Sequence, residues 1–270
     1  MSNIINPSEL TPLTIHAFKL FAPVRVNKAN TFAFLDTGAS HDTISQKLAE
    51  GFPRAGAIPV TSAFEQRMFD TVGDIEIDFL GNVRYTNAHV DQISADNSLP
   101  FNTDITLGAP TIFAKALILD FRLTGIMLPQ KVSGESWIAL PAKFVQKKDI
   151  CMIQLASQNV TLHALFDTGA GLSVVNSAHI DEIELDLQPA FELEINNATG
   201  TKATQKLVVC SGLRIGNTVL PPFDCFATDL QAIEKGLGCR IDIIFGANAM
   251  LKGGFRWLFD KLAGEAFVAV

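Results

Sequence analysis

The sequence predicts an all-β chain that consists of two similar halves. Short alternating or apolar runs punctuated by Asn, Gly and Pro recur along its 270 residues, for example at 24–38, 159–169 and 204–228. This pattern is typical of strands joined by tight turns. In addition, residues 163–177 (HALFDTGAGLSVVNS) align with residues 32–46 (FAFLDTGASHDTISQ) without a gap. Such internal similarity indicates a duplicated structural unit.

A second pair of segments supports the duplication. Residues 103–121 (TDITLGAPTIFAKALILDF) match residues 241–260 (IDIIFGANAMLKGGFRWLFD), and each segment follows the first motif of its half at a similar distance. One short motif can recur by chance, whereas two landmarks in the same order indicate a duplicated domain. The aligned positions are Asp36 with Asp167, Thr37 with Thr168, Gly38 with Gly169, Ala39 with Ala170, Asp104 with Asp242, Gly108 with Gly246 and Asp120 with Asp260.

Local patterns predict turns and helices at matching points of the two halves. Asn-Lys-Ala-Asn at 27–30 and Ser-Gln-Asn at 157–159 predict hairpin turns just before each acid-bearing strand. The residues after the two aligned glycines, 109–116 and 247–253, could each form a short helix. We expect little helix elsewhere.

The middle of the chain is expected to join the two halves. Residues 124–150 have no counterpart of equal length at the N-terminus. The sequence therefore suggests an N-terminal unit at 1–125, a connection at 126–150 and a C-terminal unit at 151–270. Strands from the N-terminus, the connection and the C-terminal residues 266–270 are expected to share one sheet between the units.

Composition argues against several classes of function. Hydrophobic residues make up 48% of the chain and charged residues 18%, which is a globular profile. The net charge of −7 and the scattered Lys and Arg argue against a nucleic-acid partner, because phosphates require a basic face. No apolar run is long enough to cross a bilayer and the N-terminus has no signal-peptide pattern, so we expect no membrane association and a cytoplasmic location.

The cysteines and histidines predict no metal centre. No two cysteines form a CxxC pair and no histidine stands at metal-ligand spacing beside them, so we expect free, mostly buried thiols and no metal or other cofactor. His41 and His163 lie near the two motifs, but neither is accompanied by a Ser or Cys elbow, which argues against a nucleophilic triad. The four cysteines are Cys151, Cys210, Cys225 and Cys239.

Each of the two motifs brings a carboxylate to the end of an apolar strand. A buried carboxylate is costly unless it is hydrogen-bonded or chemically employed. If Asp36 and Asp167 meet across a pseudo-twofold axis, they cannot both be ionised, because like charges about 3 Å apart repel strongly in a low dielectric. One carboxyl then keeps its proton while the other acts as a base, which is the arrangement needed to activate water and to protonate a departing amine. Four further acids are expected only to cap backbone amides at turns or strand edges: Asp104, Asp120, Asp242 and Asp260.

The motifs and the glycine elements resemble those of aspartic peptidases of the pepsin and retropepsin type. The resemblance rests on Asp-Thr-Gly-Ala at 36–39 and 167–170, each followed later by a glycine element, and it covers about 31–121 and 160–260. It implies a bilobal, pepsin-like acid protease fold, with two barrel-like β lobes related by a pseudo-twofold axis and an interlobe sheet. It also implies endopeptidase activity on a peptide or protein substrate. Thr106 departs mildly from the apolar residue usual in the first glycine element.

The resemblance implies a role for each motif residue. Asp36 and Asp167 would be catalytic and would share a proton and the water that attacks the scissile carbonyl. The other motif residues would support the active-site loops: the threonines would lock the loops together, and the glycines would allow close approach of a peptide backbone. These supporting residues are Thr37, Gly38, Ala39, Thr168, Gly169 and Ala170.

The chain combines features of both peptidase types. Both aspartates lie on one polypeptide, as in pepsin, so we expect a monomer to suffice. Ala39 and Ala170 follow the two Asp-Thr-Gly triplets, as in retropepsins, where pepsins usually place Ser or Thr. A hydroxyl there can donate to the carboxylate and favour its ionised form. We therefore expect higher carboxyl pKa values than in pepsin and activity at mildly acidic to near-neutral pH.

A hairpin that covers the cleft is expected in one or both halves. The candidates are residues 61–74 and 191–207. The flap tyrosine of pepsins has no counterpart, because the only tyrosine, Tyr85, comes too late in the half. A phenylalanine in the first hairpin could contact substrate instead, or could be an ordinary core ring. The residues considered for substrate contact are Phe64, Phe69, Asn196 and Gly200.

Two other functions remain open at this point. Actin-like and hexokinase-like ATPases also duplicate an apolar–Asp–x–Gly hairpin, but 270 residues is short for their α/β fold and the glycine elements would be unexplained. A protease-like fold can also serve as a peptide-binding module with weak or no catalysis. The presence of both acids argues against a pure binder, since a buried pair of carboxyls adds nothing to binding.

Overall fold

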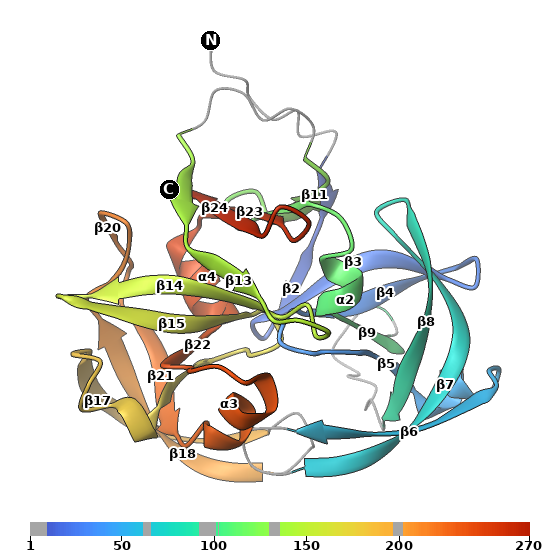
Figure 1. Ribbon diagram of the computed structural model, residues 1–270, viewed down its shortest axis with the longest axis horizontal. Coiled ribbons are helices and arrows are strands. Elements are labelled where there is room, and N and C mark those ends of the chain that lie inside the picture. Colours follow the sequence, from blue (N-terminus) through green and yellow to red (C-terminus); the bar gives the residue numbers. More distant parts are fainter. Residues whose placement is uncertain (1–9, 62–65, 92–100, 102, 130–135, 197–201) are drawn as a thin grey trace.

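The protein is built mainly from strands in three sheets, with a few short helices (Figure 1). The prediction of an all-β fold is confirmed, and the α/β fold of an actin-like ATPase does not fit. Within the described residues, no helix is long and apolar enough to cross a membrane. The computed structural model describes residues 10–61, 66–91, 101, 103–129, 136–196 and 202–270.

An eight-stranded sheet, here called the N-terminal sheet, is formed by the first part of the chain. Its hairpin β3–β4 turns at Asn27 and Lys28, which both have positive φ (46° and 69°), as a type I′ turn requires. The predicted turn at 27–30 is therefore confirmed. In sheet order the strands are β2 (Thr14–His16), β3 (Lys19–Val26), β4 (Ala29–Asp36), β9 (Ile105–Gly108), β5 (Asp42–Ser45), β8 (Asn82–Asp91), β7 (Gln66–Phe79) and β6 (Arg54–Thr61).

A ten-stranded sheet, here called the C-terminal sheet, is formed by the second part. Strands β14 and β15 pair from Ser157 with Val160 inward, so the predicted turn at 157–159 is also confirmed. In sheet order the strands are β17 (Asp186–Asn196), β18 (Lys202–Ser211), β21 (Phe223–Thr228), β16 (Ser173–Asn176), β22 (Ile243–Gly246), β15 (Val160–Asp167), β14 (Cys151–Ser157), β19 (Leu213–Ile215) and β20 (Thr218–Val219), with β13 (Ala142–Phe144) paired to β14.

The two sheets repeat the same strand pairings around the acids. β4 runs parallel to β9 with Asp36 opposite Gly108, and β15 runs parallel to β22 with Asp167 opposite Gly246. In each sheet the strand that follows the acid, β5 or β16, lies antiparallel to the glycine strand and parallel to a further strand, β8 or β21. The aligned landmarks of the sequence therefore occupy equivalent places in the two sheets.

A third sheet takes strands from distant parts of the chain, as the sequence suggested. The N-terminus, the connection and the C-terminus all contribute to it, together with β10 and β23, which follow the two glycine elements. In sheet order its strands are β1 (Thr11–Pro12), β11 (Gly125–Met127), β10 (Leu117–Asp120), β23 (Arg256–Asp260), β24 (Glu265–Ala269) and β12 (Ile138–Leu140). We call it the shared sheet.

Helices follow both glycine strands, where the sequence predicted them. The first of these helices ends at Ile112, which is earlier than the expected segment 109–116, whereas the second spans the expected residues. Two more short helices and a 3₁₀ turn were not expected. The helices are α1 (Gln46–Ala49), α2 (Ala109–Ile112), α3 (Gln231–Leu237) and α4 (Ala247–Gly253), with the 3₁₀ turn η2 at Ser177–His179.

Aromatic rings link the halves through the shared sheet. The Phe166 ring lies 5.0 Å from that of Trp257 and 4.7 Å from that of Phe259, and the Phe113 ring lies 5.2 Å from Phe259. All four side chains are buried, and burying each ring contributes about 1.5–3 kcal/mol. Phe166 belongs to β15, the strand that ends at Asp167, and Phe113 follows α2, the helix after Gly108. The acid-bearing strand of the second half and the glycine element of the first half therefore pack into the same core.

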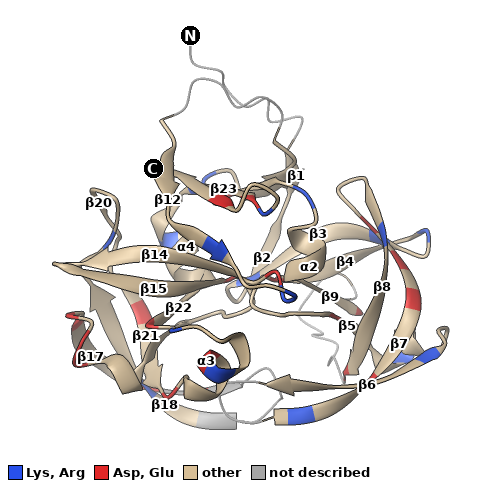
Figure 2. Ribbon diagram, in the orientation of Figure 1, with Lys and Arg blue, Asp and Glu red and all other residues tan. Residues whose placement is uncertain are grey.

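Charged side chains of both signs are spread over the fold, and the cysteine thiols are free. Figure 2 shows Lys and Arg interleaved with Asp and Glu over the described part of both halves. The shared sheet holds a buried ion pair, in which Arg256 Nε donates to Asp120 Oδ2 at 2.5 Å. All four cysteines are free, and three of them are buried, as predicted.

Candidate active site

Each acid stands at the C-terminal end of a strand, β4 or β15, and is held by the loop that follows. Asp36 Oδ1 accepts hydrogen bonds from the backbone N–H groups of Gly38 (3.0 Å) and Ala39 (2.9 Å). Asp167 Oδ1 accepts from Gly169 (2.8 Å) and Ala170 (3.1 Å). A short acidic side chain that bonds to N–H groups two and three residues ahead closes a tight turn. The two loops therefore have the same local geometry for the same sequence reason.

The two threonines connect the loops to each other. The Thr37 hydroxyl accepts the N–H of Thr168 (2.9 Å) and donates to the carbonyl of Phe166 (2.8 Å). The Thr168 hydroxyl accepts the N–H of Thr37 (3.1 Å) and donates to the carbonyl of Leu35 (2.7 Å). Both threonines are fully buried. Four hydrogen bonds without competing water thus fix one loop against the other.

Each glycine of the motif lies directly against the acid of the opposite loop. A Cβ atom on Gly38 would lie 2.4 Å from Cγ of Asp167, and one on Gly169 would lie 2.2 Å from Cγ of Asp36. Such distances are too short for any side chain, so glycine is required at both positions for steric reasons. Each carboxyl therefore packs against the opposite loop, and the two carboxyls lie close enough to influence each other's pKa.

The pairing of the carboxyls changes their acidity. Burial raises the pKa of both Asp36 and Asp167 above the usual range, and the negative charge of Asp167 raises the pKa of Asp36 further. The backbone N–H bonds from the two loops oppose this rise without cancelling it. Because the two groups interact, the pair titrates as a unit and retains one proton at a pH where isolated aspartates are ionised.

The residues that follow the glycine strands hydrogen-bond to the loops that hold the acids. Ala109 N–H donates to the carbonyl of Ala39 and Ala247 N–H donates to the carbonyl of Ala170, both at 2.8 Å. Gly108 fits because a Cβ there would lie 2.4 Å from the carbonyl oxygen of His41. The residues around both glycines therefore contact the loops that hold the acids.

Sequence reasoning missed the side chains that bind the two glycine strands. In the first half, Asp42 Oδ1 accepts the N–H of Gly108 at 2.8 Å. In the second, the Ser173 hydroxyl accepts the N–H of Gly246 at 3.0 Å and donates to Asn248 Oδ1 at 2.9 Å. Asp42 and Ser173 occupy the same place in the gap-free alignment, and both are polar. That coincidence was the available signal.

The residues suggested for substrate contact are only partly covered by the structure. Phe64 and Gly200 lie outside the described residues, and Asn196 is described only as the end of β17. Phe69 lies in β7, partly exposed, and its ring centroid is 5.3 Å from that of His89 in β8. The described parts of the two candidate hairpins are β6 with β7 and β17 with β18, paired antiparallel in each case.

The chemistry available at this site is that of the acid pair itself. Among the described residues, no group of three or more His, Cys, Asp or Glu side chains is placed to hold a metal ion. A pair of carboxyls that shares one proton can remove a proton from one group and deliver one to another.

Comparison with known proteins concerns the second half. Residues 153–249 match the family model described as aspartyl protease. Comparison with curated proteins gives no match. The matched segment contains Asp167, the hairpin β17–β18 and the glycine strand β22. This part of the chain is therefore similar to the aspartyl proteases, which supports peptidase activity in general.

Proposed function

We propose that the protein is an aspartic endopeptidase that uses Asp36 and Asp167 as its catalytic pair. The observation that carries the proposal is that two equivalent loops bring their carboxyls close together. Thr37 and Thr168 fix these loops against each other by four buried hydrogen bonds. The family match in residues 153–249 supports the same conclusion for the second loop.

In the proposed reaction a water molecule lies between the two carboxyls. The ionised carboxyl takes a proton from the water as the oxygen attacks the scissile carbonyl carbon. The protonated carboxyl stabilises the developing oxyanion, and a proton then passes to the leaving amine as the C–N bond breaks. The N–H groups of residues 38, 39, 169 and 170 hold the acids in place during this exchange.

The same site suggests the pH range of the reaction. The pKa values of both carboxyls are raised, and burial is the largest cause. Alanine at positions 39 and 170 supplies no hydroxyl that would favour ionisation. We therefore propose activity at mildly acidic to near-neutral pH.

The organisation of the proposed enzyme follows from its chain. Residues 1–125 and 151–270 would form two lobes, joined by 126–150, with a peptide bound between them and covered by hairpins β6–β7 and β17–β18. Since one chain supplies both acids, a monomer would suffice. The interleaved charges in Figure 2 favour a peptide or protein substrate over a nucleic acid.

A peptide library assayed between about pH 3 and pH 8 tests the proposal. Wild type should cleave, and Asp36→Asn and Asp167→Asn should each lose activity by at least about 1,000-fold. Both variants should still bind peptide, because an amide can accept the same N–H bonds. Asp260→Asn is the matched control, since Asp260 binds only the N–H of Ala263 at 3.1 Å among its described contacts.

The alternative of a peptide-binding module predicts a different result. Wild type would then bind library peptides without cleaving them at any pH, and a statine-type transition-state mimic would bind no better than a plain peptide. Transition-state mimics bind true enzymes about 100-fold or more tighter than substrates. Equal affinity for the two ligands would refute the peptidase.

A further inference from the structure

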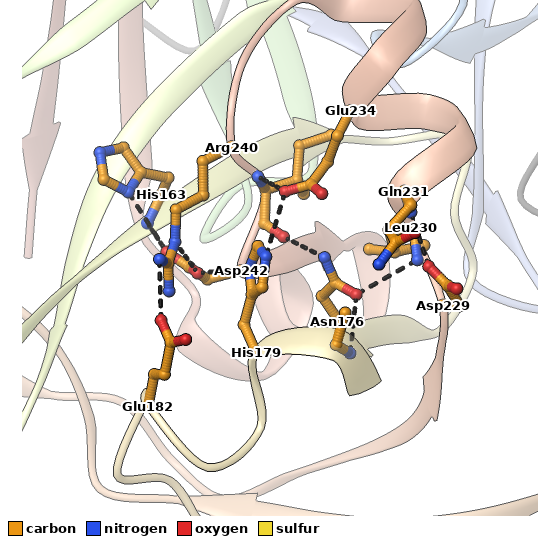
Figure 3. Close-up of polar contacts among 12 residues, drawn as sticks. His163, Asn176, His179, Glu182, Asp229, Leu230, Gln231, Glu234, Arg240 and Asp242 are labelled. Atoms are coloured by element: carbon orange, nitrogen blue, oxygen red, sulfur yellow. Dashed lines mark hydrogen bonds and ion pairs between the residues drawn. The ribbon is translucent and has the colours of Figure 1, made fainter.

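A second cluster of ionisable side chains lies around Asp242, outside the acid pair (Figure 3). Asp242 is 1% exposed and precedes β22. Its Oδ2 accepts the backbone N–H of His163 (2.8 Å), as the expected capping role requires, and beyond that role it also approaches His163 Nδ1 (3.2 Å). Its Oδ1 faces His179 Nδ1 (3.0 Å) and Arg240 Nε (2.7 Å). Burial opposes ionisation, but the N–H of His163 and the Arg240 guanidinium outweigh it and lower the pKa of Asp242.

The ionised Asp242 determines where His179 carries its proton. A carboxylate only accepts hydrogen bonds, so the contact at Oδ1 requires a proton on Nδ1 of the imidazole. In the neutral ring, Nε2 is then a bare acceptor. Nε2 lies 3.7 Å from Oε1 of Glu234, which already accepts the N–H of Ile241 at 2.7 Å.

One proton therefore reverses the sign of the contact between His179 and Glu234. With Nε2 unprotonated, two groups of lone pairs face each other and repel. With Nε2 protonated, the same contact is an ion pair, and His179 bridges two carboxylates. The ring is accessible to solvent protons, because His179 and Glu234 line an open hollow of about 420 Å³.

Glu234 belongs to α3, and α3 touches both halves of the molecule. Besides Glu234, α3 is tied to its surroundings by Leu230 N–H, which donates to Asn176 Oδ1 (3.2 Å), and by Lys148 Nζ, which donates to the carbonyl of Gly236 (2.6 Å). The helix also contacts β6 of the N-terminal sheet. Figure 1 shows it between the C-terminal sheet and this strand.

Two neighbouring ionisable groups keep one charge state near neutral pH. Arg240 stays charged, because its bond to Asp242 raises its pKa, and the Cys239 thiol stays neutral, because burial raises its pKa. His163 contacts the opposite oxygen of Asp242. The groups that face His179 or Glu234, directly or through Arg240, are Asp242, Arg240, Cys239, Lys235, Glu182 and His163.

We propose that His179 is a positioning residue for α3: its imidazolium holds the helix on the C-terminal sheet through Glu234, and the neutral ring lets the helix loosen. The contact between α3 and β6 makes this a proton-dependent link between the two halves. The link does not depend on whether the acid pair cleaves peptides.

Hydrogen exchange of the α3 amides tests the link without any assay of activity. After correction for the intrinsic pH dependence of exchange, wild type should show about three- to tenfold stronger protection of α3 at about pH 5 than at about pH 8. His179→Gln is neutral at both values and should show weak protection without a pH difference. Strands β15 and β22 serve as the internal reference for an intact fold.

Two further variants separate this contact from the cluster as a whole. His163→Gln alters the same carboxylate from its other side and should keep the wild-type pH difference. Glu234→Gln offers an amide N–H to neutral Nε2, so α3 should stay protected at both pH values. The proposal is wrong if wild-type α3 shows no pH difference, if His179→Gln retains it, or if His163→Gln abolishes it. If His179→Gln fails to fold, Glu234→Gln alone tests the proposal, which is then wrong if α3 of this variant is not protected at both pH values.

Discussion

Asp42 in the first half and Ser173 in the second stand at equivalent places and support their loops by different means. Asp42 accepts the N–H of Gly108 with one oxygen and the hydroxyl of Thr111, at 2.6 Å, with the other. Ser173 accepts the N–H of Gly246 and relies on the side-chain amide of Asn248. One support is a buried carboxylate, and the other is a neutral pair.

The loops above these supports are nevertheless alike. Each acid accepts two N–H bonds of similar length, and the two threonines exchange equivalent bonds. The duplicated geometry therefore depends on bonds that the motifs make themselves, whereas the polar group beneath them can vary. The difference is electrostatic: burial raises the pKa of Asp42, while the neutral Ser173 has no charge to lose in this pH range.

Adding a methyl group to either motif glycine should cause the largest effect and should affect both halves alike. Gly38→Ala and Gly169→Ala would each force a Cβ atom against the opposite carboxyl, at 2.4 and 2.2 Å in the present geometry. Separating the acids by even about 1 Å costs on the order of 100-fold in rate. Steady-state peptide cleavage measures the loss.

Gly51→Ala is the control for the glycine variants, because a Cβ there would lie 3.8 Å from its nearest neighbour, the carbonyl oxygen of Leu48. It should cleave as wild type does. If one motif variant were inactive and the other fully active, the two loops would not be functionally equivalent.

Removing either threonine hydroxyl should give the next largest effect, again of equal size. Thr37→Val leaves the Thr168 N–H and the Phe166 carbonyl buried without partners, and Thr168→Val does the same to Thr37 and Leu35. Each unpaired group costs about 1–3 kcal/mol, so each variant should lose about 2–6 kcal/mol of unfolding free energy. Urea denaturation measures this loss. Thr161→Val, on the exposed side of β15, should change little.

The contrast between loops and supports also explains what the sequence could predict. Asp36, Thr37, Gly38 and their counterparts were found because identical residues recur without a gap, and identity is visible in one sequence. Asp42 and Ser173 were missed because the aligned residues differ in type, and only coordinates show that both bind a glycine N–H. The role of Asp42 thus depends on a contact between distant segments.

The fold was predictable to a similar degree. The alternating runs and hairpin turns sufficed for an all-β chain with a shared sheet, because strand periodicity and turn residues are local properties. Helix α3 was not predicted, because its 7 residues are too few to show an apolar period. The clear helix signal in the sequence is Gly238 at its C-terminal end, which has a φ of 68° in the structure. The position of α3 is determined by contacts with Asn176, His179 and Lys148.

Replacing each of the two supports should distinguish the halves, because only the support in the first half carries a charge that depends on pH. The pKa of Asp42 is raised in the folded protein, so its contribution to stability is complete below the unfolded value of about 3.9 and is lost as pH rises through the folded value. Asp42→Asn should therefore gain unfolding free energy relative to wild type, on the order of 1 kcal/mol, between about pH 4 and pH 7. Ser173→Ala should instead lose about 1–3 kcal/mol at both values, because the N–H of Gly246 loses its acceptor.

Urea denaturation at the two pH values measures both variants. The difference between each variant and wild type is compared, so that the pH dependence of the acid pair cancels. An Asp42→Asn variant whose difference from wild type stays constant with pH would mean that the buried carboxylate is not the pH-sensitive support.

Restoring a hydroxyl after each motif should give the smallest effect and tests whether the acids act as one unit. The N–H groups of Ala39 and Ala170 already donate to Asp36 and Asp167 at 2.9 and 3.1 Å, so a serine hydroxyl at either position would lie close to its carboxylate. Donation to the ionised form lowers a carboxyl pKa, and Ala39→Ser and Ala170→Ser should each move the pH–rate profile toward acid by up to about one unit. If the pair titrates as a unit, the two shifts should be nearly equal, because either hydroxyl acts on the shared proton. A shift from one variant alone would show that the proton belongs to a single aspartate, and the equivalence of the two loops would then end at the carboxyl groups.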